Sequence, residues 1–329
     1  MSAGPAESAP RPVLYRDLRD LTPFRTAVIR TPVRGLAEGV GGAVSGILAG
    51  RTRGILPVEG GAPRLGKVGR KAPGKAAKEV HAAIFGSSDP NRLIALAHSY
   101  PGWAGLCYLM AGLLSYAHGG HLRAAELLQR GMLTRNEDDA NLYASAYLSR
   151  VVTRVTVAER VEVPVLFSEE GVFLALSHSL REAGQTEAAL AALTGLPPSL
   201  PMALARCSLA AVLGRHGDVV EDTDGLRNGD DLAAALLLVR ARSLRKLGAN
   251  ASARAVLQEV LRRRGTDFTL RSDALTDRAL LLLDNGRKAL NRLEWQHRQP
   301  VELETVRAIR KDAELHELWD REYGWTDDD

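Results

Sequence analysis

Three short stretches of the chain carry residue types that bind nucleotides or metal ions, but each is incomplete. Residues Gly61–Val68 read GAPRLGKV, where Val68 replaces the Ser or Thr that holds Mg²⁺ in a phosphate-binding loop. His118 and His121 flank a double glycine, whereas a zinc site needs three or four ligands. Residues Glu221–Gly225 match the start of a calcium loop but lack its closing Glu. We therefore predict no metal and no cofactor.

The sequence also lacks the local signatures of catalysis. The motifs G-x-S-x-G, H-E-x-x-H and C-x-x-C are absent, and nothing in the spacing joins a nucleophile to a base. Cys107 and Cys207 are too few for a disulfide framework, which indicates a reducing compartment. The N-terminus has no signal-peptide pattern, and no apolar run approaches the ~20 residues of a membrane span. We predict a cytoplasmic protein that is not an enzyme, with no catalytic residues and no small-molecule substrate.

Positive charge is concentrated toward the N-terminus. Residues 1–80 hold 14 Lys and Arg against 6 Asp and Glu, although the whole chain has a net charge of +4. Residues 31–70 contain 11 glycines, which disfavour helix. We predict that residues 1–70 form a basic, Gly/Pro-rich and largely flexible arm. Such an arm is able to make weak contacts with anionic lipid or nucleic acid through residues 1–80, and a solubilising tail is the plainer alternative.

The rest of the chain is patterned as helices, interrupted by one stretch rich in branched residues. Residues 150–167 contain many Val and Thr, and a polar break at Ala158–Arg160 divides them into two runs. Branched residues favour strands, so we predict an inserted β-hairpin. Pro164 within it suits an edge strand.

Helical patterns cover most of the remaining sequence. The order Asp89-Pro90 is a helix start signal, because a capping side chain precedes a proline at the first helical position. Residues 272–283 and 287–297 predict one last, irregular helix pair. Residues 71–299 are therefore predicted to form a helical repeat domain, and residues 300–329 a charged C-terminal capping helix.

The helical patterns repeat with a period of just over thirty residues. They end at Gly184, Gly217 and Gly248, which are 33 and 31 residues apart, and a Leu lies four residues before each glycine. An earlier unit ends at Gly120 and has Ala125 five residues later. A period of this size predicts stacked helical hairpins, because no single hairpin can bury its own apolar face.

This spacing, together with Pro201 at the end of one unit, resembles the tetratricopeptide repeat family over residues 103–265. Phe173 stands at the family's early aromatic position, and Asp222 stands where a small residue is expected. The resemblance implies an all-α fold, a TPR-like α-solenoid wound as a right-handed superhelix, here with one small inserted β-hairpin. Residues 140–260 are also similar to the repeat domain that precedes the ATPase module of actinobacterial type VII secretion ATPases.

The family resemblance implies that a protein or peptide binds on the concave face, which is lined by the first helix of each unit. Clustered guanidinium groups bind carboxylates in a bidentate manner, so we hypothesise an acidic peptide or a C-terminal carboxylate as ligand. The alternative is that the charged side chains at the inward positions of these helices form a solvated helix face. Carried onto this sequence, the inward positions are His178, Arg181, Arg215, Arg242, Arg245 and Lys246.

We therefore expect a non-catalytic adaptor or scaffold that binds a partner protein or peptide. One alternative is a peripheral protein tethered to a membrane or to nucleic acid by its basic N-terminal arm. Another is a secretion-linked chaperone or assembly factor, which rests on the likeness to secretion ATPases.

Overall fold

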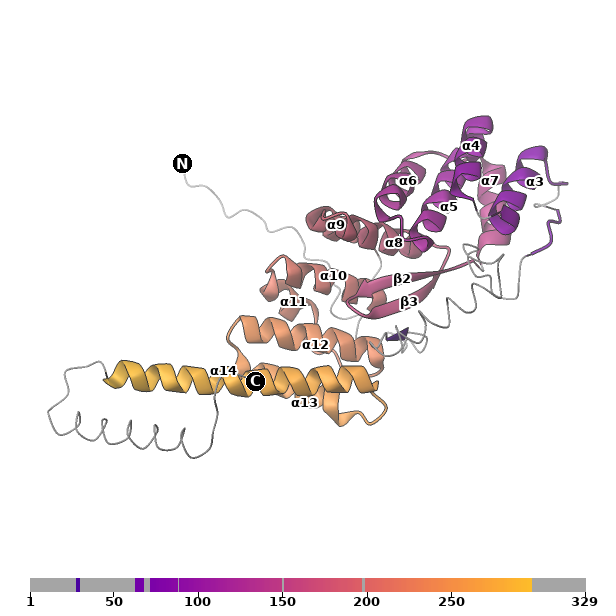
Figure 1. Cartoon of the computed structure of the whole chain (residues 1–329). Coiled ribbons are helices and arrows are strands. Elements are labelled where there is room, and N and C mark those ends of the chain that lie inside the picture. Colours follow the sequence, from indigo (N-terminus) through magenta and orange to yellow (C-terminus); the bar gives the residue numbers. More distant parts are fainter. Residues whose placement is uncertain are drawn as a thin grey trace, which may run out of the picture. The chain divides into compact units, whose positions relative to one another are not determined.

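The computed structural model of the chain describes residues 28–29, 63–67, 72–87, 89–149, 151–196 and 199–297. Most of these residues are helical, and a small antiparallel sheet is inserted among the helices (Figure 1). This confirms the predicted fold class. Most of the predicted N-terminal arm, and all of the predicted capping helix at 300–329, lie outside the described residues. Among the described helices, none has the length and apolar character that crossing a membrane requires.

Antiparallel helix pairs joined by short turns form the body of the described chain. The pairs are α5 (Ala104–Ala117) with α6 (His121–Leu133), α8 (Glu169–Glu182) with α9 (Thr186–Ala192), α10 (Leu200–Val212) with α11 (His216–Asp222), and α12 (Asp231–Lys246) with α13 (Asn250–Arg262). The other helices are α3 (Lys75–Ala82), α4 (Pro90–Ser99), α7 (Asp138–Tyr143) and α14 (Phe268–His297). As predicted, Asp89 caps α4 by accepting a hydrogen bond from the backbone of Asn91.

Each of these pairs turns at a glycine in the left-handed conformation. The φ angles are 78° at Gly119, 78° at Gly184, 75° at Gly214 and 79° at Gly248. The next residue returns a backbone hydrogen bond to the first helix, for example from Gln185 to the carbonyl of Leu180 at 2.8 Å. This arrangement ends a helix by satisfying its last carbonyls, and its positive φ favours glycine.

The turn geometry corrects the register that the sequence predicts for two repeats. Gly217 lies inside α11, and that pair turns at Gly214 instead. Likewise, the first pair turns at Gly119 rather than Gly120. In the observed register the residue five positions after each turn glycine is an apolar Ala or Val that is 0% exposed, namely Ala124, Ala189, Val219 and Ala253. Spacing alone could not tell which of two nearby glycines adopts a positive φ.

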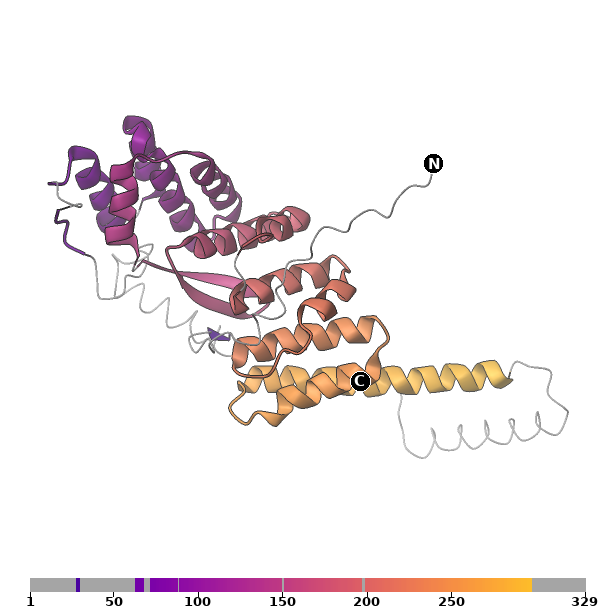
Figure 2. The ribbon, with the colours of Figure 1, turned by 180° about the vertical axis from the view of Figure 1, so that it is seen from behind.

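The predicted β-hairpin is present as β2 (Val152–Ala158) and β3 (Val161–Leu166). A short third strand, β1 (Val28–Ile29), pairs with β3 at Glu162 and Val161, so the strand order is β1-β3-β2. β3 is therefore central rather than an edge strand, although Pro164 lies beyond the described span of β1. β2 packs against α8 and α10, which ties the hairpin to the helix pairs (Figure 2).

The last helix differs from the prediction. α14 is one helix of 30 residues, where the sequence predicts an irregular pair broken near Gly286. Gly286 lies inside it as an ordinary helical residue, because a glycine lowers helix stability without ending a helix. The chain divides into two compact units at Leu275 and Thr276, inside α14. All the site residues considered below belong to the first unit.

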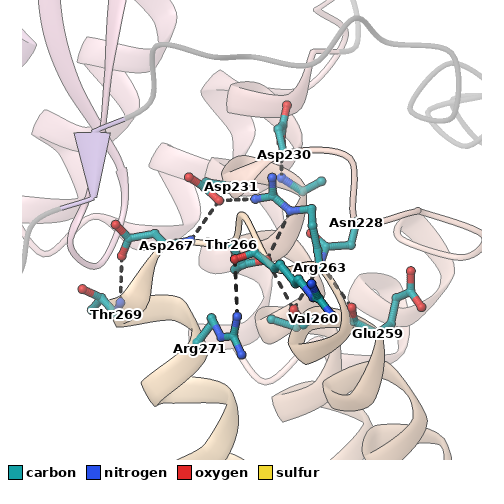
Figure 3. Close-up of polar contacts among 12 residues, drawn as sticks. Asn228, Asp230, Asp231, Glu259, Val260, Arg263, Thr266, Asp267, Thr269 and Arg271 are labelled. Atoms are coloured by element: carbon teal, nitrogen blue, oxygen red, sulfur yellow. Dashed lines mark hydrogen bonds and ion pairs between the residues drawn. The ribbon is translucent and has the colours of Figure 1, made fainter.

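A polar network fastens the start of α14 to the N-terminal end of α12 (Figure 3). Asp231 accepts hydrogen bonds from the Arg263 side chain and from the backbone of Asp267, the latter at 3.2 Å. Asn228 donates to the carbonyls of Glu259 and Val260, both at 3.2 Å. The network fixes where α14 begins relative to α12, and it therefore positions the first turns of α14.

Candidate functional site

A groove of about 270 Å³ lies where the turn of the β-hairpin faces the first helices of the last three pairs. We call it the hairpin groove. Its walls come from α8, α10, α12, the first residue of α11, the first turns of α14 and the residues around the hairpin turn. The apolar part of its lining includes Leu204, Leu238 and Leu270, which are at most 4% exposed. The groove therefore has an apolar floor that belongs to the protein core.

Charged side chains line the same groove above this floor. The cations are Arg181, Arg242 and Lys246, and the carboxylates are Glu159 and Asp273. Cations thus outnumber carboxylates among the lining residues. A groove that combines an apolar floor with a basic rim suits a ligand that has both an apolar group and a carboxylate.

One carboxylate in the groove lies between two arginines. An oxygen of Asp273 is 3.7 Å from the guanidinium of Arg242 on α12, and the other oxygen is 3.9 Å from that of Arg160 at the hairpin turn. The side chains are 30%, 47% and 46% exposed respectively. These ion pairs are long and partly hydrated, so each contributes little to stability.

Three of the six predicted binding residues line the hairpin groove, namely Arg181, Arg242 and Lys246. Arg181 also donates to the neighbouring Glu182 at 2.8 Å, and this hydrogen bond lowers the pKa of the Glu182 carboxyl. Arg245 is half-buried on α12 and is not among the residues that line the groove. The helical spacing thus placed some cations on one face and missed others.

His178 lies beneath the surface rather than in the groove, with its side chain 9% exposed. Its Nδ1 is 2.9 Å from the phenol oxygen of Tyr116, which also accepts the backbone N–H of Thr156 at 3.1 Å. Its Nε2 is 3.5 Å from Glu182. Burial raises the pKa of Tyr116 to about 12, so the phenol stays protonated and serves as a structural link between α5, α8 and β2.

Arg215 lies at a different cavity, of about 490 Å³, between α9, α10 and α11. It donates to Glu187 at 2.7 Å. Arg206 and Asp222 form an ion pair in the same cavity, where burial raises the pKa of Asp222 and Arg206 opposes that rise. The lining has four carboxylates and two arginines, so this second cavity does not share the basic character of the hairpin groove.

Sequence reasoning missed Glu159, Arg160 and Asp273 as groove residues. The polar break at Ala158–Arg160 was a usable signal for the hairpin turn, but it gave no sign that the turn faces α12. Asp273 follows Arg160 by more than a hundred residues, and no spacing rule connects them. Only the packing of the hairpin beside the helices brings these charges together.

A serine and a histidine also meet in the groove. His216 Nδ1 is 3.3 Å from Ser243 Oγ, and both residues contribute to the lining. Ser243 lies inside α12 and is 1% exposed, so a substrate could not approach its hydroxyl for nucleophilic attack. We interpret this contact as a structural hydrogen bond.

These features define the class of this protein as an α-solenoid of stacked helical hairpins with a β-hairpin beside one groove. No protein-family model and no curated protein matches the chain. One solved structure that is similar to it is the crystal structure of the N-terminal domain of the EccA1 ATPase from the ESX-1 secretion system of Mycobacterium tuberculosis. The two are 14% identical with a TM-score of 0.44, and the similarity covers 67% of this chain and 81% of that one.

The sequence suggested a likeness to a secretion ATPase domain, and the N-terminal domain of EccA1 is a domain of such an ATPase. Membership of the tetratricopeptide repeat family stays a prediction. The fold class rests on the helix pairs, their turn glycines and the inserted hairpin of the chain itself.

Proposed function

We propose that this protein is a non-catalytic adaptor that binds an extended acidic segment of a partner protein in the hairpin groove. The observation that carries the proposal is the combination of an apolar floor with a basic rim in one groove. Stacked helical hairpins commonly use such extended surfaces to bind peptides.

The apolar floor accounts for one half of the ligand chemistry. Leu204, Leu238 and Leu270 lie at the bottom of the groove, where a branched or aromatic ligand side chain would lose contact with water. Burying such a side chain contributes about 1.5–3 kcal/mol, which is enough for an anchor but not for a stable complex by itself. Further contacts along the rim are needed.

The basic side chains at the rim of the groove account for the other half of the ligand chemistry, the carboxylate. Arg242 and Lys246 lie one helical turn apart on α12, and Arg181 faces the groove from α8. A carboxylate on the ligand would gain charge-assisted hydrogen bonds from these donors. An acidic residue close to an apolar anchor, or a free C-terminal carboxylate next to an apolar last residue, satisfies both requirements.

The proposal can be tested by capturing partners from lysates of the source cell and identifying them by quantitative mass spectrometry. The groove variant combines Arg242→Ala with Lys246→Ala. The control combines Arg254→Ala with Arg264→Ala, two exposed arginines that are not among the groove residues. Both variants lose two positive charges, so their comparison separates the groove from net charge.

We expect the wild type and the control variant to capture the same partner, and the groove variant to lose it. The segment of that partner that binds should contain Asp or Glu beside an apolar residue, which a peptide array of its sequence would reveal. Equal capture by all three proteins would contradict the proposal, as would a bound segment without acidic residues.

A further inference from the structure

Asp273 is the carboxylate of the groove that most resembles a bound ligand. It lies between Arg242, which lines the groove, and Arg160, which lies at the hairpin turn. Its two oxygens face different guanidinium groups, one at 3.7 Å and one at 3.9 Å. A carboxylate held between two arginines is the arrangement expected of an acidic ligand in this groove.

We propose that Asp273 occupies the carboxylate-binding position of the hairpin groove in the free protein, and that a ligand carboxylate displaces it. This inference rests on the proposed function, because it names the position that the acidic ligand takes. The binding position is the space between Arg160 and Arg242. Its ligand class is a carboxylate, supplied by an acidic side chain or a chain terminus of the partner segment.

The ion pairs of Asp273 are weak enough to be exchanged. Both are longer than a charge-assisted hydrogen bond, and all three side chains are partly exposed to water. A ligand that also places an apolar group on the groove floor gains contacts that Asp273 does not make. The ligand carboxylate therefore has an advantage over the internal one.

Displacement of Asp273 by a ligand carboxylate also affects the β-hairpin. Arg160 has a φ of 63°, a left-handed conformation that residues other than glycine rarely adopt. Its guanidinium is 3.9 Å from Asp273 on α14 and 3.7 Å from the adjacent Glu159. When Asp273 is displaced, Arg160 is able to remain with Glu159 or to move to the ligand. In both cases the direct link between the hairpin turn and α14 is lost.

The displacement can be measured without a known partner, with sodium acetate as the probe. The variant Asp273→Asn keeps the size of the side chain and removes its charge. Its control is Asp224→Asn, which removes a carboxylate that accepts a hydrogen bond from Arg240 at 3.0 Å, and neither residue is among those that line the groove. Side-chain Nε–Hε signals of arginine in NMR spectra report acetate binding, and sodium chloride at equal ionic strength corrects for screening.

We expect acetate to shift the signals of Arg160 and Arg242 together in Asp273→Asn, with one shared saturation curve. The apparent acetate affinity should be roughly fivefold higher than in the wild type, because the competing carboxylate has been removed. The Asp224→Asn variant should respond like the wild type. Acetate shifts that are absent, that involve one arginine alone, or that are equal in the wild type and Asp273→Asn would overturn the inference.

A second measurement separates this inference from the proposed function. Backbone amide hydrogen exchange around Glu159–Val161 should be faster in Asp273→Asn, because the link from the hairpin turn to α14 is removed. Unchanged exchange would overturn the inferred role of Asp273 in the hairpin. Partner capture that does not depend on Arg242 and Lys246 would contradict the adaptor proposal, whereas the acetate and exchange results would still decide the role of Asp273.

Discussion

The phenol oxygen of Tyr116 lies 2.9 Å from Nδ1 of His178, although 62 residues separate them in the sequence. The same oxygen accepts the backbone N–H of Thr156 at 3.1 Å. One buried side chain on α5 thus joins α8 and the β-hairpin. Because the hairpin turn forms part of the groove, this link helps to determine where the groove opens.

Replacing Tyr116 with Phe should weaken this connection. The change removes one hydroxyl and leaves the Thr156 N–H and the His178 Nδ1 without that partner, which should lower the free energy of unfolding by about 1–3 kcal/mol. Urea denaturation measures the loss. Hydrogen exchange should rise at the Thr156 amide more than at Val165, further along the sheet. An unchanged unfolding free energy would show that the hydroxyl contributes nothing to stability.

The repeat register can be tested by two matched glycine substitutions. Gly184 has a φ of 78° at a helix-pair turn, so Gly184→Ala should destabilise the protein by about 1–2 kcal/mol. Gly217 lies inside α11 with open space at its Cβ position, so Gly217→Ala should be neutral or stabilise it by up to about 1 kcal/mol. Thermal unfolding of both variants would distinguish the turn glycine from the helical one. Equal effects would contradict the observed register.

The pH dependence of stability should differ in sign between two carboxylates. Burial raises the pKa of Asp222, so its stabilising effect is present below its unfolded pKa of about 3.9 and is lost as pH rises through the folded pKa. The variant Asp222→Asn has no titratable side chain at residue 222. The stability of this variant relative to the wild type should therefore increase as pH rises from about 4 through the raised folded pKa of Asp222.

Glu182 provides the opposite case. The hydrogen bond from Arg181 lowers its pKa, so its stabilising effect is present above the unfolded pKa of about 4.3 and is lost as pH falls. Relative to the wild type, Glu182→Gln should lose stability as pH rises through the lowered folded pKa toward about 4.3, and the difference should stay constant at higher pH. Urea denaturation across the pH range measures both differences. If the stability differences of the two variants changed in the same direction with pH, the assigned causes of the pKa shifts would be contradicted.

Both thiols should be unreactive in the folded protein. Cys107 and Cys207 are 0% and 1% exposed, and burial raises the pKa of each thiol to about 12. Because the thiolate is the reactive form, a disulfide reagent should modify neither residue at neutral pH until the protein unfolds. The rate at which the reagent modifies the two cysteines should rise with urea concentration in parallel with the unfolded fraction of the protein. Rapid reaction in native buffer would show that the core opens locally.

Several features of this fold could be predicted from the local sequence. The helix start at Asp89-Pro90 and the β-hairpin within 150–167 depend on capping and on branched side chains, which act over a few residues. The repeat period could also be predicted from the sequence, because similar helical hairpins bury apolar residues at equivalent positions. Its exact register could not, since Gly214 and Gly217 are three residues apart and spacing does not distinguish them, whereas the structure has the turn at Gly214, five residues before the buried Val219.

The groove was harder to predict. Helical spacing was enough to bring Arg242 and Lys246 to one face of α12, because they are one turn apart. It placed His178 on a binding face, but that side chain is 9% exposed and lies against the phenol of Tyr116 and the carboxylate of Glu182.

The sequence by itself determined that the chain forms stacked helical hairpins with one inserted β-hairpin, because capping, glycine turns and apolar periodicity are local properties. The tertiary structure decided which charges meet. Arg160 and Asp273 face each other because β2 packs against α8 and α10, which directs the hairpin turn toward the start of α14. Contacts between distant elements depend on the packing of the whole core, and no short stretch of sequence contains that information.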